Sequence, residues 1–523
     1  MNRCFIFLFS LLVVTVISSC DNDTTTITFV ETTDTHSRFD AMGNDIAYIR
    51  SLQDSLGARL ILLDGGDNFQ GSTQMYLSNH DTVMPHLGAQ FFNFLPYDAI
   101  VVGNHDIEAG RDVFDRAYSQ TKPVVLGANI IDNNSGEPYF KPYTVIEREG
   151  YRIAILGLLT PYVTTWVPER LRQDLNFEPI EQSAEKWLNI IRKNENPDVM
   201  VGLFHSGWDG IDEETEVSPE LGQENAVRWI AENVDGFDII FYGHDHKAKA
   251  EVITNKNGHH VAVLNAGHRG HNLAKAEVKL EKNKRPIINV SLIPTNGETQ
   301  DIEWVTMIGV YDSIAHSYQN TAVAQLPLTI HSDDTYQGPC LWADEIHRAQ
   351  FDIVANEGMT ADISMAAPLS QHKTIDSGTL TIKDFFTWYP FENSLSLITM
   401  KGSEVREYLE YSFDNKKPIY NFDSGAGILY EVDSSQEKGN RINIIAMADG
   451  SSFNEERYYS VVMNSYRAMG GGGHLIRGLG WSKDVIKERT IWESDKDLRS
   501  LFIDWARKKE TLNDKTLDCW KIK

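Results

Sequence analysis

The sequence predicts an α/β protein of two domains, and two observations carry this prediction. The chain has 523 residues, which is more than a single hydrophobic core usually organises, so two domains are expected. Short apolar runs recur along the first half and are bounded by turn residues, a pattern that indicates buried strands in a layered α/β domain.

The first residues have the features of an export signal. Arg3 precedes an apolar run from Phe5 to Ile17, which is short for a membrane span and typical of a signal peptide. The residues up to Cys20 (ISSC) resemble the processing site of bacterial lipoproteins, which implies cleavage before Cys20 and its acylation. We therefore expect a signal peptide over 1–19 and a lipidated tether over 20–26. An ordinary secreted protein or a plain membrane anchor is the alternative.

This reading predicts an exported bacterial lipoprotein in the periplasm or at the cell surface, a monomer held to the membrane only by its N-terminal lipid. The formal net charge of −26 argues against a nucleic-acid polymer as partner, because such binding depends on clustered basic residues. An anionic substrate would need local positive charge, for instance a metal ion. Beyond Cys20 the chain has two cysteines, Cys340 and Cys519, which could pair or remain buried thiols.

Five of the predicted strands end in Asp, Asn or His. The blocks at the strand ends are DTH at 34–36, GGDN at 65–68, GNHD at 103–106, FHSG at 204–207 and GHDH at 243–246. Sites in layered α/β domains assemble at strand ends, so we expect these side chains to meet. Imidazole, carboxylate and amide ligands suit Zn, Mn, Fe or Co. Seven candidates exceed one tetrahedral site and suffice for two divalent ions.

These five blocks, in this order, resemble the calcineurin-like metallophosphoesterase family. The resemblance implies a catalytic domain over 27–300 built as a four-layered αββα sandwich of two packed sheets flanked by helices. It also implies the ligand sets. One metal would be held by Asp34, His36 and His246, the other by Asn104, His205 and His244, and both would be bridged by Asp67.

The resemblance gives a catalytic role to His105, which follows the ligand Asn104 directly. A hydroxide shared by the two ions would attack phosphorus, and the imidazole would assist the leaving alkoxide. Many relatives in the nucleotidase branch orient this imidazole with an Asp three residues later, where this chain has Glu108. The longer side chain needs another backbone or rotamer to reach it. Asp106 could substitute for Glu108, or the imidazole could act unpaired.

Other histidines receive weaker assignments. His268 and His271 follow a strand-like run and could act behind the ligands. His86 and His347 are expected to be ordinary surface or capping residues.

Mixed helical spacing predicts a linker helix over 301–325. The region 326–523 resembles the smaller α+β C-terminal domain of the 5′-nucleotidase family, which holds the nucleoside. The resemblance implies stacking of a base between Phe391 and Tyr466, with Asn393 as a polar contact and Arg467 near ribose or base. Stacking accepts any base, whereas the alternative is that both aromatics belong to the core. Turnover is expected to need a hinge motion about the linker.

One departure from the family pattern selects the predicted activity. Relatives that cleave 5′-nucleotides usually carry Gly-Gly-x-Arg near the start of this domain, where this chain reads ADISMAAPLSQHK at 361–373. The AAP stretch and NSYRAMGGGGH resemble the 2′,3′-cyclic-nucleotide 2′-phosphodiesterase and 3′-nucleotidase branch, which is the predicted activity. The alternatives are a 5′-nucleotidase or nucleotide-sugar hydrolase of the same fold and, in another class, a non-catalytic binding lipoprotein displayed at the surface.

Overall fold

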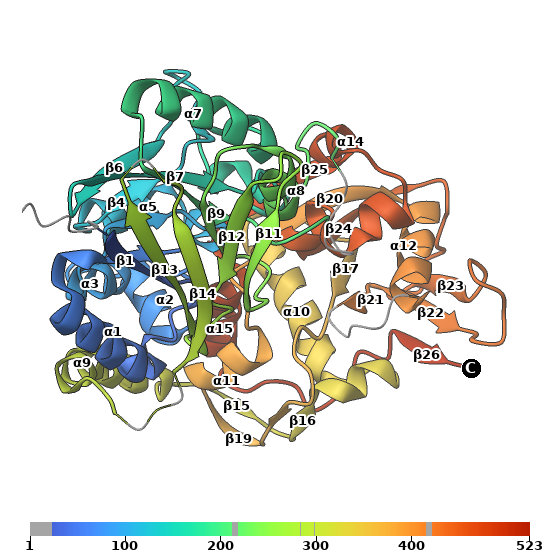
Figure 1. Ribbon diagram of the computed structural model, residues 1–523. Coiled ribbons are helices and arrows are strands. Elements are labelled where there is room, and N and C mark those ends of the chain that lie inside the picture. Colours follow the sequence, from blue (N-terminus) through green and yellow to red (C-terminus); the bar gives the residue numbers. More distant parts are fainter. Residues whose placement is uncertain (1–23, 212–217, 283, 296, 298, 415–420) are drawn as a thin grey trace, which may run out of the picture.

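Figure 1 shows the computed structural model of the chain, which describes residues 24–211, 218–282, 284–295, 297, 299–414 and 421–523. The predicted signal peptide and Cys20 lie outside the described residues. Thr24 to Thr26, assigned above to the tether, already belong to a strand, because they pair with Lys279 to Glu281. None of the described helices combines the length and apolar composition that a membrane span requires.

The first half of the chain forms two six-stranded sheets. The first has the order β14-β13-β1-β2-β3-β4 and the second the order β11-β12-β10-β9-β7-β6. The strands of the first sheet are β1 (Thr24–Thr32), β2 (Leu60–Asp64), β3 (Ala99–Val101), β4 (Val124–Leu126), β13 (Asn272–Glu281) and β14 (Ile287–Pro294). Those of the second are β6 (Tyr143–Arg148), β7 (Tyr151–Leu159), β9 (Val199–His205), β10 (Ile239–Tyr242), β11 (Lys249–Thr254) and β12 (His260–Asn265).

Parallel pairing at the centre of each sheet brings the strand ends to one edge. β1 to β4 run parallel, as do β7, β9, β10 and β12, whereas β13 and β11 pair antiparallel with their neighbours. Parallel strands are covered on both faces, and β2 and β9 are accordingly buried along their whole length. This explains their continuous apolar sequences.

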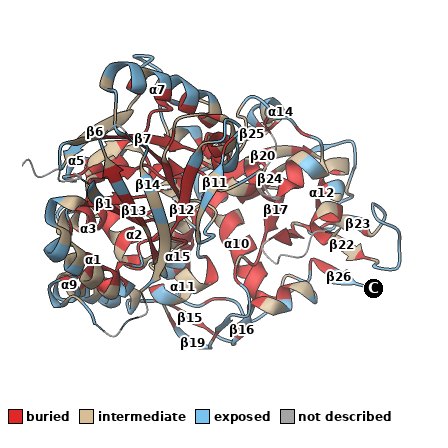
Figure 2. Cartoon of the chain, in the orientation of Figure 1, coloured by how far each residue is buried: buried red, intermediate tan, exposed pale blue. Residues whose placement is uncertain are grey.

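The two sheets pack face to face, and helices cover both outer faces (Figures 1 and 2). The layer between the sheets is apolar and includes Phe29, Ile61, Ile155 and Val201. A second core lies between the first sheet and its helices, and a third between the second sheet and α7 and α8. The helices of this half are α1 (Gly43–Leu56), α2 (Thr73–His80), α3 (Leu87–Phe94), α4 (Asn104–Glu108), α5 (Arg111–Ser119), α6 (Val163–Trp166), α7 (Ile180–Glu195) and α8 (Val227–Asn233). The predicted αββα sandwich is confirmed.

The linker helix is shorter than predicted and is fixed to the first domain. α9 spans Ile302–Gln319, capped by the Asp301 side chain, and β15 (Ala322–Leu326) begins three residues later. Trp304 is fully buried, and its indole N–H donates to the Phe39 carbonyl. The prediction of helix up to 325 was wrong, because residues 322–326 pair with β19 (Gly378–Thr381) of the second domain.

The second domain is built on a five-stranded sheet of order β21-β17-β24-β20-β25, with a three-stranded sheet β23-β22-β26 beside it. The further strands are β16 (Ile330–His331), β17 (Ile363–Ala366), β18 (Thr374–Ile375), β20 (Ser394–Lys401), β21 (Ser424–Ala426), β22 (Ile428–Val432), β23 (Ile442–Met447), β24 (Tyr458–Asn464), β25 (Thr490–Asp497) and β26 (Trp520–Ile522). The helices are α10 (Leu341–Asn356), α11 (Ile382–Trp388), α12 (Gly402–Asp414), α13 (Ser465–Ala468), α14 (Lys483–Arg489) and α15 (Leu498–Lys509). Cys340 and Cys519 are buried free thiols.

Candidate metal centre and active site

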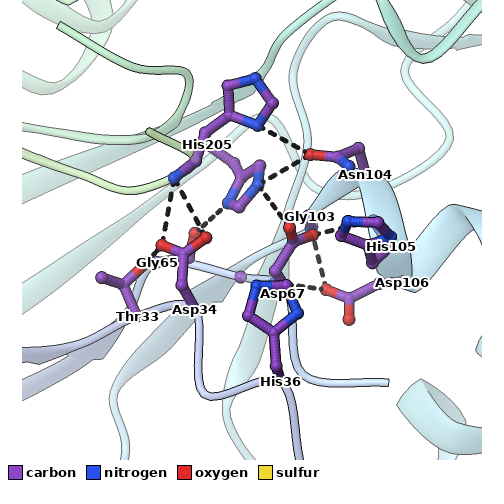
Figure 3. A network of polar contacts seen from close by, with 12 residues as sticks. Thr33, Asp34, His36, Gly65, Asp67, Gly103, Asn104, His105, Asp106 and His205 are labelled. Atoms are coloured by element: carbon purple, nitrogen blue, oxygen red, sulfur yellow. Dashed lines mark hydrogen bonds and ion pairs between the residues drawn. The ribbon is translucent and has the colours of Figure 1, made fainter. Parts of the chain in front are cut away.

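The loops that carry the seven candidate ligands meet at the carboxyl edge of the two sheets. Asp34 and His36 follow β1, Asp67 follows β2, and Asn104 opens α4 just after β3. His205 is the last residue of β9, and His244 and His246 follow β10. Figure 3 shows the side chains of Asp34, Asp67, Asn104 and His205 gathered in one place.

Five of the seven residues adopt a left-handed backbone, which non-glycine residues rarely do. They are Asp34, His36, Asp67, His244 and His246, with φ between 44° and 81°. Such conformations are costly and concentrate at functional sites. Glycines permit the close approach of the loops, because a Cβ on Gly103 would lie 2.2 Å from the Asp67 backbone nitrogen. The turn chemistry after each strand therefore serves to aim the ligands.

The ligand atoms lie close enough to hold two ions. Two groups can each be spanned by one cation, Asp34 with His36 and His246 and Asp67 with His205 and His244, their ligand atoms lying within 4.8 Å of one another. The Nε2 atoms of His36 and His246 are 2.9 Å apart, and His246 Nε2 is 3.4 Å from Asp34 Oδ1. A third such group joins Asp67 to His36 and His105, so Asp67 lies between the two sets.

The contacts around His205 favour a positive charge at this site. His205 Nδ1 donates to the Gly65 carbonyl at 2.6 Å. In a neutral ring Nε2 is then an acceptor, yet it faces Asn104 Oδ1 at 3.0 Å and Asp67 Oδ2 at 3.2 Å. Burial lowers the pKa of His205, but Asp67 raises it more, to about 10. A divalent ion between these three acceptors supplies the positive charge that they lack, so the residues fit the predicted metals.

His105 lies beside this cluster and is held by a carboxylate. Its backbone N–H donates to Asp67 Oδ1 at 2.8 Å, and its Nδ1 is 2.5 Å from Glu108 Oε2. The short helix α4 brings Glu108 one turn along, so the longer side chain reaches the ring. Burial opposes the charged ring, but Asp67 and Glu108 raise the pKa of His105 to about 9.

Asp106, considered above as another partner for His105, has a different position. Its carboxylate accepts hydrogen bonds from the backbone N–H groups of Asn68, Phe69 and Gly103, and from the Tyr118 hydroxyl. It therefore ties the loop after β2 to the loop after β3. The sequence placed Asp106 in the block GNHD but gave no indication of this bracing role.

The remaining histidines divide into two groups. His268 stacks on His246 with ring centroids 4.8 Å apart, and His271 is 5.0 Å from His268. The expectation that His347 is a surface or capping residue was wrong, since it is buried within α10, whereas His86 is buried at the N-cap position of α3. His347 lies between the hydroxyls of Ser364 and Ser424, at 2.8 and 3.0 Å, and no charge pattern in the sequence marks such a core position.

The sequence reasoning also missed Glu224. This residue lies in the loop before α8, is buried, and its Oε1 is 3.1 Å from His244 Nε2. It follows no strand and belongs to none of the five blocks, so the strand-end pattern could not find it.

Two of the predicted substrate contacts lie on neighbouring segments of the second domain. Phe391 is 41% exposed, and the ring of Tyr466 lies against Gly471, where an added Cβ would be 2.5 Å from the ring. The Ser394 backbone N–H donates to Ser465 Oγ at 3.1 Å, which brings the two segments side by side. Asn393 Oδ1 accepts from the Tyr389 hydroxyl at 3.4 Å.

Arg467 is buried beside Tyr466, with its guanidinium carbon 5.5 Å from the centroid of that ring. It is 1% exposed, and its Nη2 donates to Asp423 Oδ1 at 3.0 Å. Its Nη1 donates to the Gly471 carbonyl at 3.2 Å. This arrangement braces the glycine loop from inside the domain, rather than presenting the guanidinium to ribose or base as predicted.

Side chains of the two domains also contact each other directly. The Tyr76 hydroxyl is 2.5 Å from Ser500 Oγ, and Arg170 Nε donates to Glu493 at 3.1 Å. Burial raises the pKa of Glu392, and Glu108 contributes to this rise. Because Glu392 lies between Phe391 and Asn393, this segment of the second domain is within electrostatic range of Glu108.

Comparison with known proteins gives a family for each domain. Residues 27–248 match the calcineurin-like phosphoesterase family, and residues 318–477 match the 5′-nucleotidase C-terminal domain. The chain is a metallophosphoesterase of the 5′-nucleotidase family. Enzymes with this catalytic domain are hydrolases that use two divalent metals, in agreement with the donor set.

Individual relatives are similar along most of the chain. A 5′-nucleotidase of Vibrio parahaemolyticus is 24% identical, with 86% of this chain and 84% of that protein covered. A 2′,3′-cyclic-nucleotide 2′-phosphodiesterase/3′-nucleotidase of Yersinia enterocolitica is 24% identical, with 79% and 74% covered. The trifunctional nucleotide phosphoesterase YfkN of Bacillus subtilis is 26% identical over 88% of this chain, which spans 36% of YfkN.

The fold is also found in solved structures. The crystal structure of a Staphylococcus aureus protein in complex with α-ketoglutarate superimposes with a TM-score of 0.77 at 19% identity, with 95% of this chain and all of that chain covered. This similarity confirms the two-domain fold.

Proposed function

We propose that the protein opens 2′,3′-cyclic nucleotides to 3′-phosphates and then removes that phosphate, as a 2′,3′-cyclic-nucleotide 2′-phosphodiesterase and 3′-nucleotidase. The hydrolytic activity is inferred from one observation. The seven predicted metal ligands lie next to the His105–Glu108 pair. The finer assignment is supported by the AAP stretch at 366–368, where no arginine is available for a 5′-phosphate, and by the Yersinia relative of that name.

Asp34, His36, His246, Asp67, Asn104, His205 and His244 would hold the two ions. When bound, the ions activate water and neutralise phosphoryl charge. Asp67 lies between the two sets and so fixes their spacing.

His105 acts on the leaving group. Glu108 accepts a hydrogen bond from the Nδ1–H group of His105, so the ring presents Nε2 to the substrate. The raised pKa of His105 keeps a proton available at Nε2, which passes to the ribose O2′ when the cyclic ester opens. Before the second reaction the ring takes up another proton from water, and this proton passes to O3′.

The second domain would hold the nucleoside. Phe391 and Tyr466 offer ring faces on adjacent segments, and each stacking contact contributes about 1–3 kcal/mol without selecting a base. Glu108 acts electrostatically on Glu392, between Phe391 and Asn393, which supports a nucleotide that contacts both domains.

A substrate panel tests the assignment. The purified protein, loaded with Zn, Mn, Fe or Co, is assayed on 2′,3′-cyclic AMP, 3′-AMP, 5′-AMP and UDP-glucose. We expect kcat/KM on the first two to exceed that on the last two. The reverse order would favour the 5′-nucleotidase alternative, which the equally identical Vibrio relative supports. No metal-dependent hydrolysis of any of the four, together with no effect of His105→Ala, would favour a binding protein.

We also propose that the protein is an exported lipoprotein acylated at Cys20. The signal-like residues 1–19 support this proposal. Labelling of cells with a palmitate analogue should mark the wild type and not Cys20→Ser, and the variant should leave the membrane fraction. Equal labelling of both would refute it.

A further inference from the structure

Glu224 contacts a predicted ligand from outside the ligand set. It is 1% exposed, and its Oε1 accepts a hydrogen bond from His244 Nε2 at 3.1 Å. The other ring nitrogen, His244 Nδ1, is 2.9 Å from Asn104 Oδ1. Glu224 and Asn104 therefore lie at opposite nitrogens of one imidazole.

This arrangement determines which nitrogen of His244 faces the metal centre. A carboxylate accepts hydrogen bonds and does not donate them, so the proton of the neutral ring must lie on Nε2. Nδ1 then carries the free electron pair, and it points to the side where Asn104 and the group of Asp67 and His205 lie. The hydrogen bond thus makes His244 ready to bind an ion before one arrives.

The ring plane of His244 is restrained as well as its tautomer. Trp166 packs against the ring, with centroids 5.5 Å apart and planes inclined by 31°. The left-handed backbone of His244 is held as well, because its N–H donates to Asp34 Oδ2 at 3.0 Å. Glu224 supplies the polar part of this restraint.

The backbone of the segment that contains Glu224 is hydrogen-bonded to Ser206, the residue that follows the predicted ligand His205. Ser206, which follows His205, donates its hydroxyl to the Glu224 carbonyl at 2.7 Å and accepts the Ala226 N–H at 3.0 Å. The Gly207 N–H donates to Asn225 Oδ1 at 3.0 Å. The segment 224–226 therefore links the end of β9 to the ligand that follows β10.

We propose that Glu224 is a positioning residue that sets the tautomer and orientation of His244 and couples it to His205 through Ser206. The inference rests on the two-ion site and does not depend on which nucleotide is cleaved. Ion affinity, measured without substrate, therefore tests it separately from the proposed function.

Four variants give the test its contrast. Glu224→Gln keeps an acceptor oxygen of the same reach, Glu224→Asp withdraws the carboxylate by one methylene, and Glu224→Ala removes it. Glu220→Ala is the matched control, because Glu220 belongs to the same loop and is exposed. Zn²⁺ or Co²⁺ is titrated into the metal-free full-length protein, ion content is determined by elemental analysis, and the visible spectrum of the Co²⁺ form is recorded.

We expect Glu224→Ala to weaken binding of one of the two ions by roughly 10- to 100-fold, the range found when outer-shell partners of metal-binding histidines are removed. The ion affinity of Glu224→Gln should stay within about threefold of the wild type, because this variant retains the acceptor oxygen. The affinity of Glu224→Asp should fall between those of Glu224→Gln and Glu224→Ala, and that of Glu220→Ala should equal the wild type. The Co²⁺ spectrum should change in Glu224→Ala and not in Glu224→Gln.

Two results would overturn the inference. One is equal affinity for both ions in the wild type and Glu224→Ala. The other is a loss in Glu224→Gln as large as in Glu224→Ala, which would mean that the charge of Glu224 acts and not its acceptor geometry. If Glu224→Ala does not fold, the ion affinities of Glu224→Asp and Glu224→Gln decide. Weaker binding in Glu224→Asp than in Glu224→Gln supports the inference, and the reverse order overturns it.

Discussion

Arg499 in α15 is a buried cation at the contact between the two domains, and its replacement by methionine has a calculable effect. Its side chain is 1% exposed, and Nη2 donates to Glu392 Oε1 at 2.9 Å. The guanidinium lies 3.9 Å from the centroid of the Phe386 ring and 4.9 Å from that of Tyr76, which belongs to the first domain. Arg499→Met keeps most of the apolar stem and removes the charge.

The dominant cost is the Glu392 carboxylate left without its partner. Removing one member of a buried ion pair costs about 3–5 kcal/mol, and because Glu392 retains 23% exposure we expect about 2–3 kcal/mol. In a domain of this size 1 kcal/mol shifts the melting temperature by roughly 2–4 °C, so the domain should melt about 5–10 °C lower. Adding Glu392→Gln removes the unpaired charge and should recover at least about half of the loss.

The deficit should also depend on pH. Burial raises the pKa of Glu392, and Arg499 opposes this rise, so without Arg499 the folded-state pKa lies further above the unfolded value. A carboxyl group raised in this way destabilises the folded state increasingly as pH rises from the unfolded pKa through the folded one. Arg499→Met should therefore be close to the wild type at pH 4.5 and least stable above pH 7.

Scanning calorimetry, which separates the transitions of two domains, is the assay. Wild type, Arg499→Met, Glu392→Gln and the double variant are compared at pH 4.5, 6 and 7.5. The reasoning is refuted if the double variant melts no higher than Arg499→Met at pH 7.5, or if the difference between Arg499→Met and the wild type is the same at every pH.

Four further predictions concern catalysis, binding, stability and motion. His105→Ala should lower kcat by about 10²- to 10⁴-fold, the usual contribution of a general acid, while elemental analysis still finds two ions per chain. Phe391→Ala should raise KM for 3′-AMP roughly 5- to 100-fold through the lost stacking contact, and leave hydrolysis of 4-nitrophenyl phosphate unchanged. Burial lowers the pKa of His347 to about 3, so below pH 6.5 the unfolded chain takes up a proton that the folded chain does not. The free energy of unfolding therefore falls by about 1.4 kcal/mol per pH unit. Denaturant titrations of His347→Gln should show a shallower decline of this free energy from pH 6.5 to 5. Gln319→Ala removes the hydrogen bond that Gln319 Nε2 donates to Thr73 Oγ1 at 2.6 Å and should leave steady-state turnover unchanged, because Trp304 and the contact of Gln74 with Asp312 still attach α9 to the first domain.

The sequence predicted the ligand-bearing loops because strand ends in a parallel sheet share an edge. The position of each of the five blocks directly after an apolar run was enough to infer that Asp34 and His244, 210 residues apart, are neighbours. Contacts made by side chains outside that pattern left no such trace. Glu224 contacts His244 from a loop, and the Asp106 carboxylate accepts hydrogen bonds from four backbone N–H groups and one hydroxyl instead of from His105.

Burial was harder to predict than proximity. His347 is polar, yet two serine hydroxyls satisfy its ring within the core, and such a pairing depends on strands that are distant in sequence. The end of the linker helix was misjudged for a similar reason. The apolar residues at 322–326 fit helical spacing, but pairing with residues 378–381 makes them a strand, and tertiary pairing overrides a weak local preference.

The contacts of α9 limit which residues can act as the hinge between the two domains. The helix is attached to the first domain along its length, by the buried Trp304 near its start, by Gln74 donating to Asp312 at 2.7 Å, and by Gln319 at its end. Contact with the second domain begins two residues later, where the Thr321 carbonyl accepts a hydrogen bond from the Ile382 N–H. A rotation that opened the site would therefore turn at residues 319–321 and break polar contacts such as Tyr76 with Ser500, rather than bend the helix. Polar contacts of this kind exchange with water at little net cost, whereas peeling α9 away would expose the buried indole of Trp304.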